Sequence, residues 1–330
     1  MTESFTDLLE KWGDAHLPKL AGTAGQDVAA WQQRFRDALD TLRGPLPDRV
    51  QPQPEILESA EQADHIRHLL RIPVSAVSTL AAHLLVPRGL SAGEQRPGLI
   101  VSHGHSRRGI EDLAGLTGQR DAAALCAVRE GYVCLAPAWW GWPGRDGHLG
   151  LIGDRDKCNV IQMAAAMYGL NVLDLHIQDG QAALDVLAAR PEVDPQRLGC
   201  LGNSYGGRTA MWLTLFDRRI TACVSAGAMN TFRERSLKLS SCGIQYLPGL
   251  LQYGDVPELY ALIAPRPLQL QAGQGDALIT PADRDHILDV AGRAYRLLGA
   301  DAQFDYVLHG EGHKLLWKHA GPFLARHLAG

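Results

Sequence analysis

The stretch "RLGCLGNSYGGRTAMWLTLF", Arg197–Phe216, contains a Gly-x-Ser-x-Gly pattern between two recognisable elements. Apolar residues before Gly202 predict a buried strand, and the helical spacing after Ser204 predicts a helix. A tight turn between an entering strand and a leaving helix can hold a serine hydroxyl outward above a sheet. Glycines at both ends of the pattern leave room where the backbone is crowded. Ser204 is therefore the predicted nucleophile.

The same five-residue pattern occurs a second time, as "GLSAG" at Gly89–Gly93. This copy follows "LLVPR" and leads into "EQRPG", a polar stretch that contains proline. No helical spacing follows it, so the pattern predicts a loop between two strands. Ser91 is therefore not expected to be catalytic.

A serine hydroxyl attacks efficiently only when a base takes its proton, and a carboxylate must orient that base. The acid is expected after the serine, just beyond the end of a later strand. The segment "PLQLQAGQGDALITP" places Asp276 in a glycine-rich turn at such a strand end. Asp283 and Asp285 fall within the following predicted helix, where a solvated face explains them, and Asp255 lies in an irregular segment. Asp276 is the predicted acid.

The histidine base is expected after the last strand, where "FDYVLHGEGHKLL" offers two candidates. His313 lies in the "GEGH" loop directly before a helical run, so its ring can reach across the top of the sheet. His309 ends the strand itself and is expected to serve in packing or hydrogen bonding. His313 is therefore the predicted base.

A developing oxyanion needs two backbone N–H donors that already point at it. Tyr205, which follows the serine, is predicted to supply one, and His105 in the loop "VSHGHSRRG" the other. The His103-x-His105 pair resembles part of a metal site. Two histidines do not make a site, however, and no carboxylate or cysteine lies at matching local spacing. No metal and no cofactor are expected.

Short apolar runs alternate with helical stretches from Ile66 to the end of the chain, which predicts an α/β fold. The central sheet is expected to be mostly parallel, with helices on both faces. One helical region is predicted from about Met163 to Arg190. Residues 1–53 form a predicted helical segment and linker, either a small cap or peripheral helices. Residues 54–330 form the predicted catalytic domain, with an irregular insert at about 230–263.

Composition and net charge argue against several classes of protein. Of 330 residues, 46% are apolar and 21% are charged, and the net charge of -4 argues against a nucleic-acid partner. No apolar stretch has the length of a membrane span and no secretory signal is apparent, so neither a membrane partner nor export is expected. The six cysteines lack metal-type spacing, and Cys158 and Cys242 fall in predicted loops. A cytoplasmic protein with reduced thiols is expected, and a homo-oligomer is compatible with the sequence.

Ser204, Asp276 and His313 in this order, with "SHGHS" upstream, resemble the α/β-hydrolase superfamily. The stretch "YLPGLLQYGDVPELYALIAPRPLQLQAGQGD" further resembles the acetyl xylan esterase-like and dienelactone hydrolase-like branches. The resemblance extends from about Ile66 to Leu328. It implies the α/β-hydrolase fold and a serine esterase, a carboxylic-ester hydrolase that acts on a small-molecule ester with a short acyl group, such as an acetylated carbohydrate.

The residue at the nucleophile position and the residue after it distinguish this chain from several related families. Dienelactone hydrolases carry a cysteine nucleophile, glucuronoyl esterases carry an arginine directly after the serine, and haloalkane dehalogenases and epoxide hydrolases use an aspartate. This chain has Ser204 and Tyr205 at those positions. Two alternatives stay open: a prolyl-oligopeptidase-like serine peptidase, and a non-catalytic hydrolase-fold binding protein.

The substrate pocket is expected to include residues near the end of the strand "GYVCLAPAWW" and in the insert. Trp140 and Trp142 are candidates because sugars pack well on indole faces. Burial of this loop against the N-terminal helices explains the tryptophans equally well. Tyr246 is a candidate because the insert comes directly before the acid strand.

Overall fold

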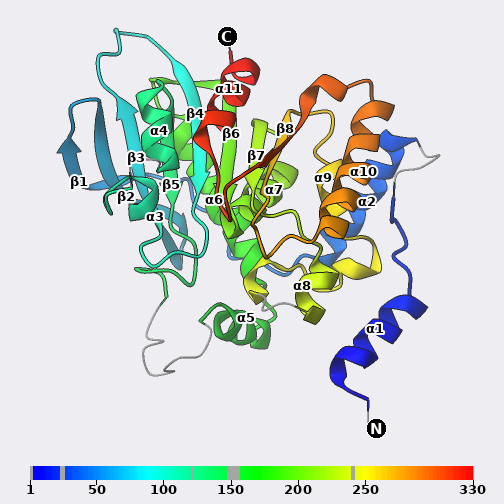
Figure 1. Cartoon of the computed structure of the whole chain (residues 1–330). Helices are drawn as coiled ribbons and strands as arrows, with labels where there is room; N and C mark the ends of the chain where they lie inside the picture. The colour runs from blue at the N-terminus through cyan, green and yellow to red at the C-terminus, as the bar shows by residue number, and fades with distance from the viewer. Residues whose placement is uncertain (1–2, 23–26, 120–121, 147–156, 239–241, 330) are drawn as a thin grey trace.

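A computed structural model of the chain describes residues 3–22, 27–119, 122–146, 157–238 and 242–329 (Figure 1). Within these ranges nine strands form one sheet in the order β1-β2-β3-β5-β4-β6-β7-β8-β9. The strands are β1 Glu55–Glu61, β2 His65–Ser75, β3 Ser78–Pro87, β4 Arg96–Ser102, β5 Val133–Pro137, β6 Val193–Asn203, β7 Ile220–Ala226, β8 Leu268–Gly273 and β9 Phe304–His309. Neighbours from β1 to β3, and the β3–β5 pair, are antiparallel, whereas β5-β4-β6-β7-β8-β9 is parallel throughout.

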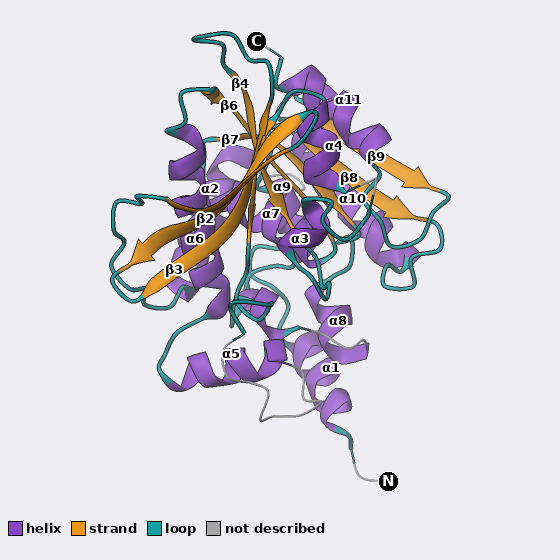
Figure 2. Cartoon of the chain, turned by 90° about the vertical axis from the view of Figure 1, so that its left-hand side faces the viewer, coloured by secondary structure: helices purple, strands orange, loops and turns teal. Residues whose placement is uncertain are grey.

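Helices cover both faces of the sheet (Figures 1 and 2). The α-helices are α1 Phe5–Ala15, α2 Val28–Leu42, α3 Ile110–Leu113, α4 Ala123–Arg129, α5 Lys157–Met167, α6 Val172–Ala188, α7 Tyr205–Phe216, α8 Phe232–Lys238, α9 Val256–Ala261, α10 Pro281–Leu297 and α11 Trp317–His327. The larger core lies between the sheet and α2, α6, α7, α9 and α10. The smaller core lies on the other face, under α4 and α11. The predicted fold class is confirmed: a mostly parallel sheet with helices on both sides.

The two N-terminal helices differ in how they contact the body of the molecule. Helix α1 buries none of its residues and is held by a capping box between Ser4 and Asp7. Helix α2 buries Trp31 and Phe35 completely in the larger core. Segment 1–53 is therefore peripheral only at α1, and α2 is an integral layer of the fold.

The helical region predicted at about Met163–Arg190 consists of the end of α5 and the whole of α6, with a break between them. Helices α5 and α6 meet at a bend of 98°. Gly169 adopts a left-handed φ of +73° in the break, and the Asn171 side chain caps α6 by accepting a hydrogen bond from the N–H of Leu173. Both features end one helix and start another. No single helix in the described ranges is long and apolar enough to cross a membrane.

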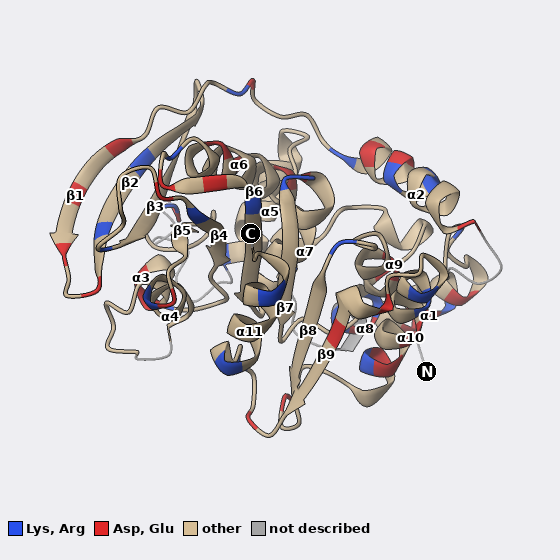
Figure 3. Ribbon diagram, turned by 90° about the horizontal axis from the view of Figure 1, so that it is seen from above, with Lys and Arg blue, Asp and Glu red and all other residues tan. Residues whose placement is uncertain are grey.

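Charged residues of both signs are interspersed along the outer helices and loops, whereas the central strands contain few (Figure 3).

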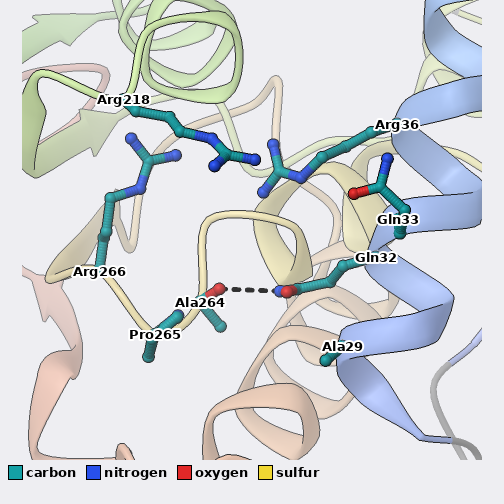
Figure 4. Close-up of a pocket in the computed structure, with 8 residues that line it drawn as sticks. All are labelled: Ala29, Gln32, Gln33, Arg36, Arg218, Ala264, Pro265 and Arg266. Atoms are coloured by element: carbon teal, nitrogen blue, oxygen red, sulfur yellow. Dashed lines mark hydrogen bonds between the residues drawn. The ribbon is translucent and has the colours of Figure 1, made fainter.

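A pocket of about 260 Å³ lies between α2 and the segment 264–266, and its lining includes none of the predicted site residues (Figure 4). Arg36 and Arg266 in its wall donate hydrogen bonds to backbone carbonyls at the ends of α7 and α9. Arg36 reaches the carbonyls of Leu215 (3.2 Å) and Leu262 (2.6 Å). Burial and the neighbouring Arg266 and Arg218 lower the pKa of Arg36 to about 10. The arginines thus satisfy carbonyls that helix ends leave without partners.

Replacing Arg36 with methionine should lower the free energy of unfolding by about 1–3 kcal/mol, because two partly buried carbonyls lose their donor. Relief of repulsion from Arg266 and Arg218 works in the opposite direction and favours the lower half of this range. Urea unfolding of the variant measures the change. The control is Arg293→Met, which removes only an exposed pair with Asp289 on α10 and should change stability by less than about 0.5 kcal/mol. Equal midpoints for Arg36→Met and the wild type would contradict the role of Arg36.

Candidate active site

Ser204 stands in a strained turn between β6 and α7. Its φ of 62° and ψ of -123° make it the one non-glycine residue with positive φ among the described residues. A Cβ on Gly206 would lie 2.1 Å from the carbonyl oxygen of Ser102, and one on Gly202 would lie 2.4 Å from the backbone of Gly206. Only glycines fit at both ends of the turn. The neighbouring backbone therefore holds Ser204 in a conformation that costs roughly 1–3 kcal/mol.

Asp276 and His313 form a hydrogen-bonded pair. His313 Nδ1 lies 2.7 Å from Asp276 Oδ2, and the Asp276 side chain is fully buried. Burial favours the protonated form of Asp276, but hydrogen bonds from His313 and from the Leu278 N–H outweigh it and lower the pKa of the carboxyl. Asp276 is thus an ionised acceptor, so His313 carries its proton on Nδ1 and leaves Nε2 as a base. That Nε2 is buried and has no hydrogen-bond partner among the described residues.

The His313 loop lies against the turn that carries the serine. The Asn203 side chain donates a hydrogen bond to the carbonyl oxygen of His313 (3.3 Å). A Cβ on Gly227, which has a φ of +60°, would lie 2.8 Å from Asn203 Oδ1 and 2.9 Å from His313 Cε1. The Ser204 N–H donates to the carbonyl oxygen of Ala226, directly before that glycine (2.8 Å). The structure thus places the predicted serine, acid and histidine after the carboxyl ends of the parallel strands β6, β8 and β9, on one edge of the sheet.

The rival acids and the second histidine have other partners. Asp255 caps α9 and also accepts from the N–H groups of Phe232 and Arg233. Asp283 accepts from the Thr231 hydroxyl, and Asp285 pairs with Arg284. His309 Nε2 bonds the carbonyl oxygen of Lys314 (3.1 Å). In the part of the chain that the structure describes, Asp276 is the carboxylate paired with His313.

The loop after β4 approaches the serine closely. A Cβ on Gly104 would lie 2.7 Å from the carbonyl oxygen of Asn203 and 3.2 Å from Ser204 Cβ. The N–H of His105, the next residue, has no hydrogen-bond partner in the described ranges. Tyr205 is the first residue of α7, where an N–H has no partner within the helix. The backbone N–H groups of Tyr205 and His105 therefore both lie near Ser204.

His103 is held neutral in the interior. Its Nδ1–H donates to the carbonyl oxygen of Gly104 (3.0 Å), and its Nε2 accepts from the N–H of Trp139 (3.2 Å). Burial lowers the pKa of His103 to about 4. Because both ring nitrogens are used, His103 shapes the loop and is not available to a ligand.

A buried network behind Tyr205 was not predicted from the sequence. The Tyr205 hydroxyl is hydrogen-bonded to His176 Nδ1 on α6, and His176 Nε2 accepts from the N–H of Trp140 (2.9 Å). Burial lowers the pKa of His176 well below its usual value, so the ring is neutral. Since Nε2 accepts, Nδ1 carries the proton and donates to the Tyr205 oxygen. A buried ion pair of Arg145 with Asp179 (2.5 Å) lies beside this network, with the Arg145 guanidinium 3.7 Å above the Trp140 ring.

The three predicted substrate-binding side chains are covered to different extents. Trp142 is 4% exposed and packs on His103 and Tyr205, with ring centroids 4.9 Å apart in each case. In this structure Trp142 is therefore a packing residue that supports the turn. Trp140 and Tyr246 are half-buried; Tyr246 packs edge-on against Phe232, and burial raises the pKa of Tyr246 to about 12. Neither ring is as exposed as an aromatic side chain that stacks on a sugar.

Comparison with solved structures places the fold. The crystal structure of "a putative acetyl xylan esterase" from Bacteroides fragilis NCTC 9343 superposes with a TM-score of 0.77 at 17% identity, covering 94% of this chain and 83% of that one. The chain therefore has the α/β-hydrolase fold. A glucuronoyl esterase from Solibacter usitatus has the same fold, with a TM-score of 0.70 at 17% identity over 95% of this chain and 98% of that one. At these identities the likeness concerns the fold.

Sequence comparison also finds similarity to proteins described as hydrolases. A Bacillus subtilis (strain 168) protein named "Putative hydrolase YtaP" is 27% identical over 287 residues, which is 84% of this chain and 92% of that protein. The model of the prolyl oligopeptidase family matches residues 171–246. These residues run from α6 through the Ser204 turn to the insert, so the match falls on the hydrolase core.

Proposed function

We propose that this α/β-hydrolase is a serine carboxylic-ester hydrolase that removes short acyl groups, acetyl above all, from a carbohydrate or related alcohol. One observation carries the proposal: a buried, ionised Asp276 fixes His313, whose Nε2 has no partner among the described residues, and the His313 loop lies against the strained turn that holds Ser204. Acyl transfer needs these three groups in this relation. In an Asp–His pair that only stabilised the fold, the buried polar atoms would all be hydrogen-bonded, whereas His313 Nε2 has no partner among the described residues.

In the proposed reaction, His313 Nε2 takes the Ser204 proton while the serine oxygen attacks the ester carbonyl. The resulting oxyanion accepts hydrogen bonds from the N–H groups of Tyr205 and His105. Asp276 stabilises the imidazolium, which then protonates the leaving alcohol, and an acyl-Ser204 ester remains. Water, activated by the same histidine, hydrolyses this ester and restores the serine.

The Tyr205–His176 hydrogen bond supports the proposed oxyanion site. The Tyr205 hydroxyl is held by His176, which is itself held by the Trp140 N–H, so the Tyr205 backbone has little freedom to move. Donors that are already oriented lower the activation barrier of acyl transfer. The network therefore gives the Tyr205 N–H a fixed direction before substrate arrives.

The proposed substrate class rests on the solved neighbours, which are described as acetyl xylan and glucuronoyl esterases. The position after the serine supports acetyl esters over glucuronoyl esters, because it holds Tyr205 where the resemblance implies an arginine for the latter. Trp140 and Tyr246 are proposed to line the pocket with their exposed edges. A cytoplasmic location and a small-molecule ester as the partner belong to the same proposal.

A serine peptidase of the prolyl-oligopeptidase type is the second candidate, because that family's model matches residues 171–246. The match lies in the core that esterases and peptidases share. The solved structures that share the fold over most of this chain are described as acetyl xylan and glucuronoyl esterases. The observations therefore favour the esterase.

Acetate release from acetylated xylose, measured beside hydrolysis of p-nitrophenyl acetate, butyrate and octanoate, tests the proposal. We expect turnover of the acetyl esters, including the sugar, and little of octanoate. A preference for butyrate or longer esters would contradict a deacetylase. Hydrolysis of peptide amides without ester turnover would favour the peptidase, and no turnover of any substrate would favour a binding protein.

A further inference from the structure

Three side chains with metal-binding atoms meet beside the active site. His105 follows β4, Cys158 lies in the first turn of α5, and Cys242 precedes a 3-10 turn in the insert. A ring nitrogen of His105 and the two sulfur atoms all lie within 4.8 Å of one another. Cys158 Sγ is 3.8 Å from His105 Nε2. The expectation of no metal rested on the lack of local cysteines, and the fold supplies them from distant positions.

The separations are compatible with a tetrahedral zinc site. Bond lengths of about 2.3 Å to sulfur and 2.0–2.1 Å to nitrogen put a sulfur and a nitrogen ligand about 3.6 Å apart at the tetrahedral angle. The 3.8 Å between Cys158 and His105 is close to this value, and small movements of Cys242 complete the set. Cys158 and Cys242 are not joined by a disulfide, so both sulfur atoms can act as metal ligands.

We propose that His105, Cys158 and Cys242 form a binding site for a thiophilic divalent ion, Zn²⁺. Two thiolates and one imidazole are soft ligands that select zinc over magnesium or calcium. Binding releases the two thiol protons, so two sulfur–zinc bonds and one nitrogen–zinc bond form as two protons leave. Three protein ligands leave a fourth position for water. The cysteines are buried and His105 is exposed, so the ion enters from the side of the histidine.

The site ties together three segments that surround the catalytic turn. The His105 ring packs on Trp142 and Tyr205, with centroids 5.2 and 5.4 Å apart. Zinc would therefore fix the loop after β4 against α5 and the insert. Occupancy would also affect ester hydrolysis through the His105 N–H, a consequence that rests on the proposed function.

Metal binding is tested without any activity assay. The reduced, chelator-treated full chain is titrated with Zn²⁺ against a chromophoric chelator, and with Co²⁺ to record thiolate-to-metal charge-transfer absorption. We expect one ion per chain, release of protons, and a Co²⁺ spectrum with thiolate bands. Cys158→Ser and Cys242→Ser should each weaken zinc binding by more than about 100-fold, beyond what loss of an outer hydrogen-bond partner costs.

Two further variants keep the test decisive. His105→Ala changes an exposed side chain, so it probes the site even if a buried cysteine variant fails to fold; it should weaken binding at least about 10-fold. Cys126→Ser on α4 is the matched control and should bind zinc as the wild type does. Zinc affinity unchanged in His105→Ala and in both cluster cysteine variants would overturn the proposal, as would the absence of thiolate bands with Co²⁺.

Discussion

Replacing Ser204 with alanine should reduce ester hydrolysis by roughly 10⁶-fold in kcat, because the covalent route through the acyl-enzyme is lost. Residual turnover above the uncatalysed rate would come from the two backbone donors beside the turn. KM should change little, since substrate binding does not require the serine oxygen. Initial rates with p-nitrophenyl acetate measure both constants, and the release of p-nitrophenol in the first turnover reports acyl-enzyme formation.

The chain supplies its own control in the second Gly-x-Ser-x-Gly copy. Ser91 is exposed in the loop between β3 and β4, where its N–H donates to the Glu94 side chain. Ser91→Ala should therefore retain full activity. Loss of activity in Ser91→Ala together with survival in Ser204→Ala would reverse the assignment.

The Ser204→Gly variant distinguishes a loss of catalysis from a loss of folding. Glycine adopts a φ of 62° without the strain that a side chain meets there. This variant should lose activity as Ser204→Ala does while its free energy of unfolding rises by about 1 kcal/mol. An inactive protein that is more stable than the wild type cannot be explained by misfolding. A less stable Ser204→Gly variant would show that the turn is not strained.

The central strands and the serine turn could be predicted because their signals are local. Strand β7 is almost wholly buried and its sequence is largely apolar, and β8 is a short buried segment between a proline and a glycine-rich turn. The glycines around Ser204 are required by steric crowding within five residues. Strand β1 carries no such signal: its residues are almost all exposed, and it exists because β2 offers a pairing edge.

Features built from distant residues could not be predicted in this way. Cys158 reads as a loop residue because the segment before α5 is polar, yet it is a buried helical residue. It contacts His105, 53 positions earlier, through the fold alone. The Tyr205–His176 bond likewise joins residues 29 positions apart on neighbouring helices. Rules based on residue spacing predict metal ligands and hydrogen-bond partners only within one element, so they cannot predict such pairs.

Replacing Asp276 with asparagine should lower kcat by about 10⁴-fold with little change in KM. An amide cannot balance the charge of the imidazolium that forms when His313 takes the serine proton. Its NH₂ group would also favour the ring form with the proton on Nε2, which cannot accept from Ser204. Because the Asp276 side chain is fully buried, water cannot take over its role.

Stability gives this variant a second, independent readout. The pKa of Asp276 is lowered in the folded state, so its ionised form stabilises the fold above the ordinary carboxyl pKa. That contribution is lost as the pH falls through the folded-state value. The stability difference between the wild type and Asp276→Asn should therefore shrink on acidification below about pH 4. Unfolding in urea across this pH range measures it.

The control for Asp276→Asn is Asp285→Asn, which changes an exposed carboxylate on α10 that pairs with Arg284. It should leave kcat within about twofold of the wild type, since surface pairs contribute little. If Asp276→Asn retained more than one-tenth of wild-type kcat, Asp276 would not be the residue that orients His313. A 2.7 Å hydrogen bond to a buried, ionised oxygen is the geometry in which that orientation matters most. The tautomer of one histidine, set by one carboxylate, thus decides whether the Ser204 hydroxyl can act as a nucleophile.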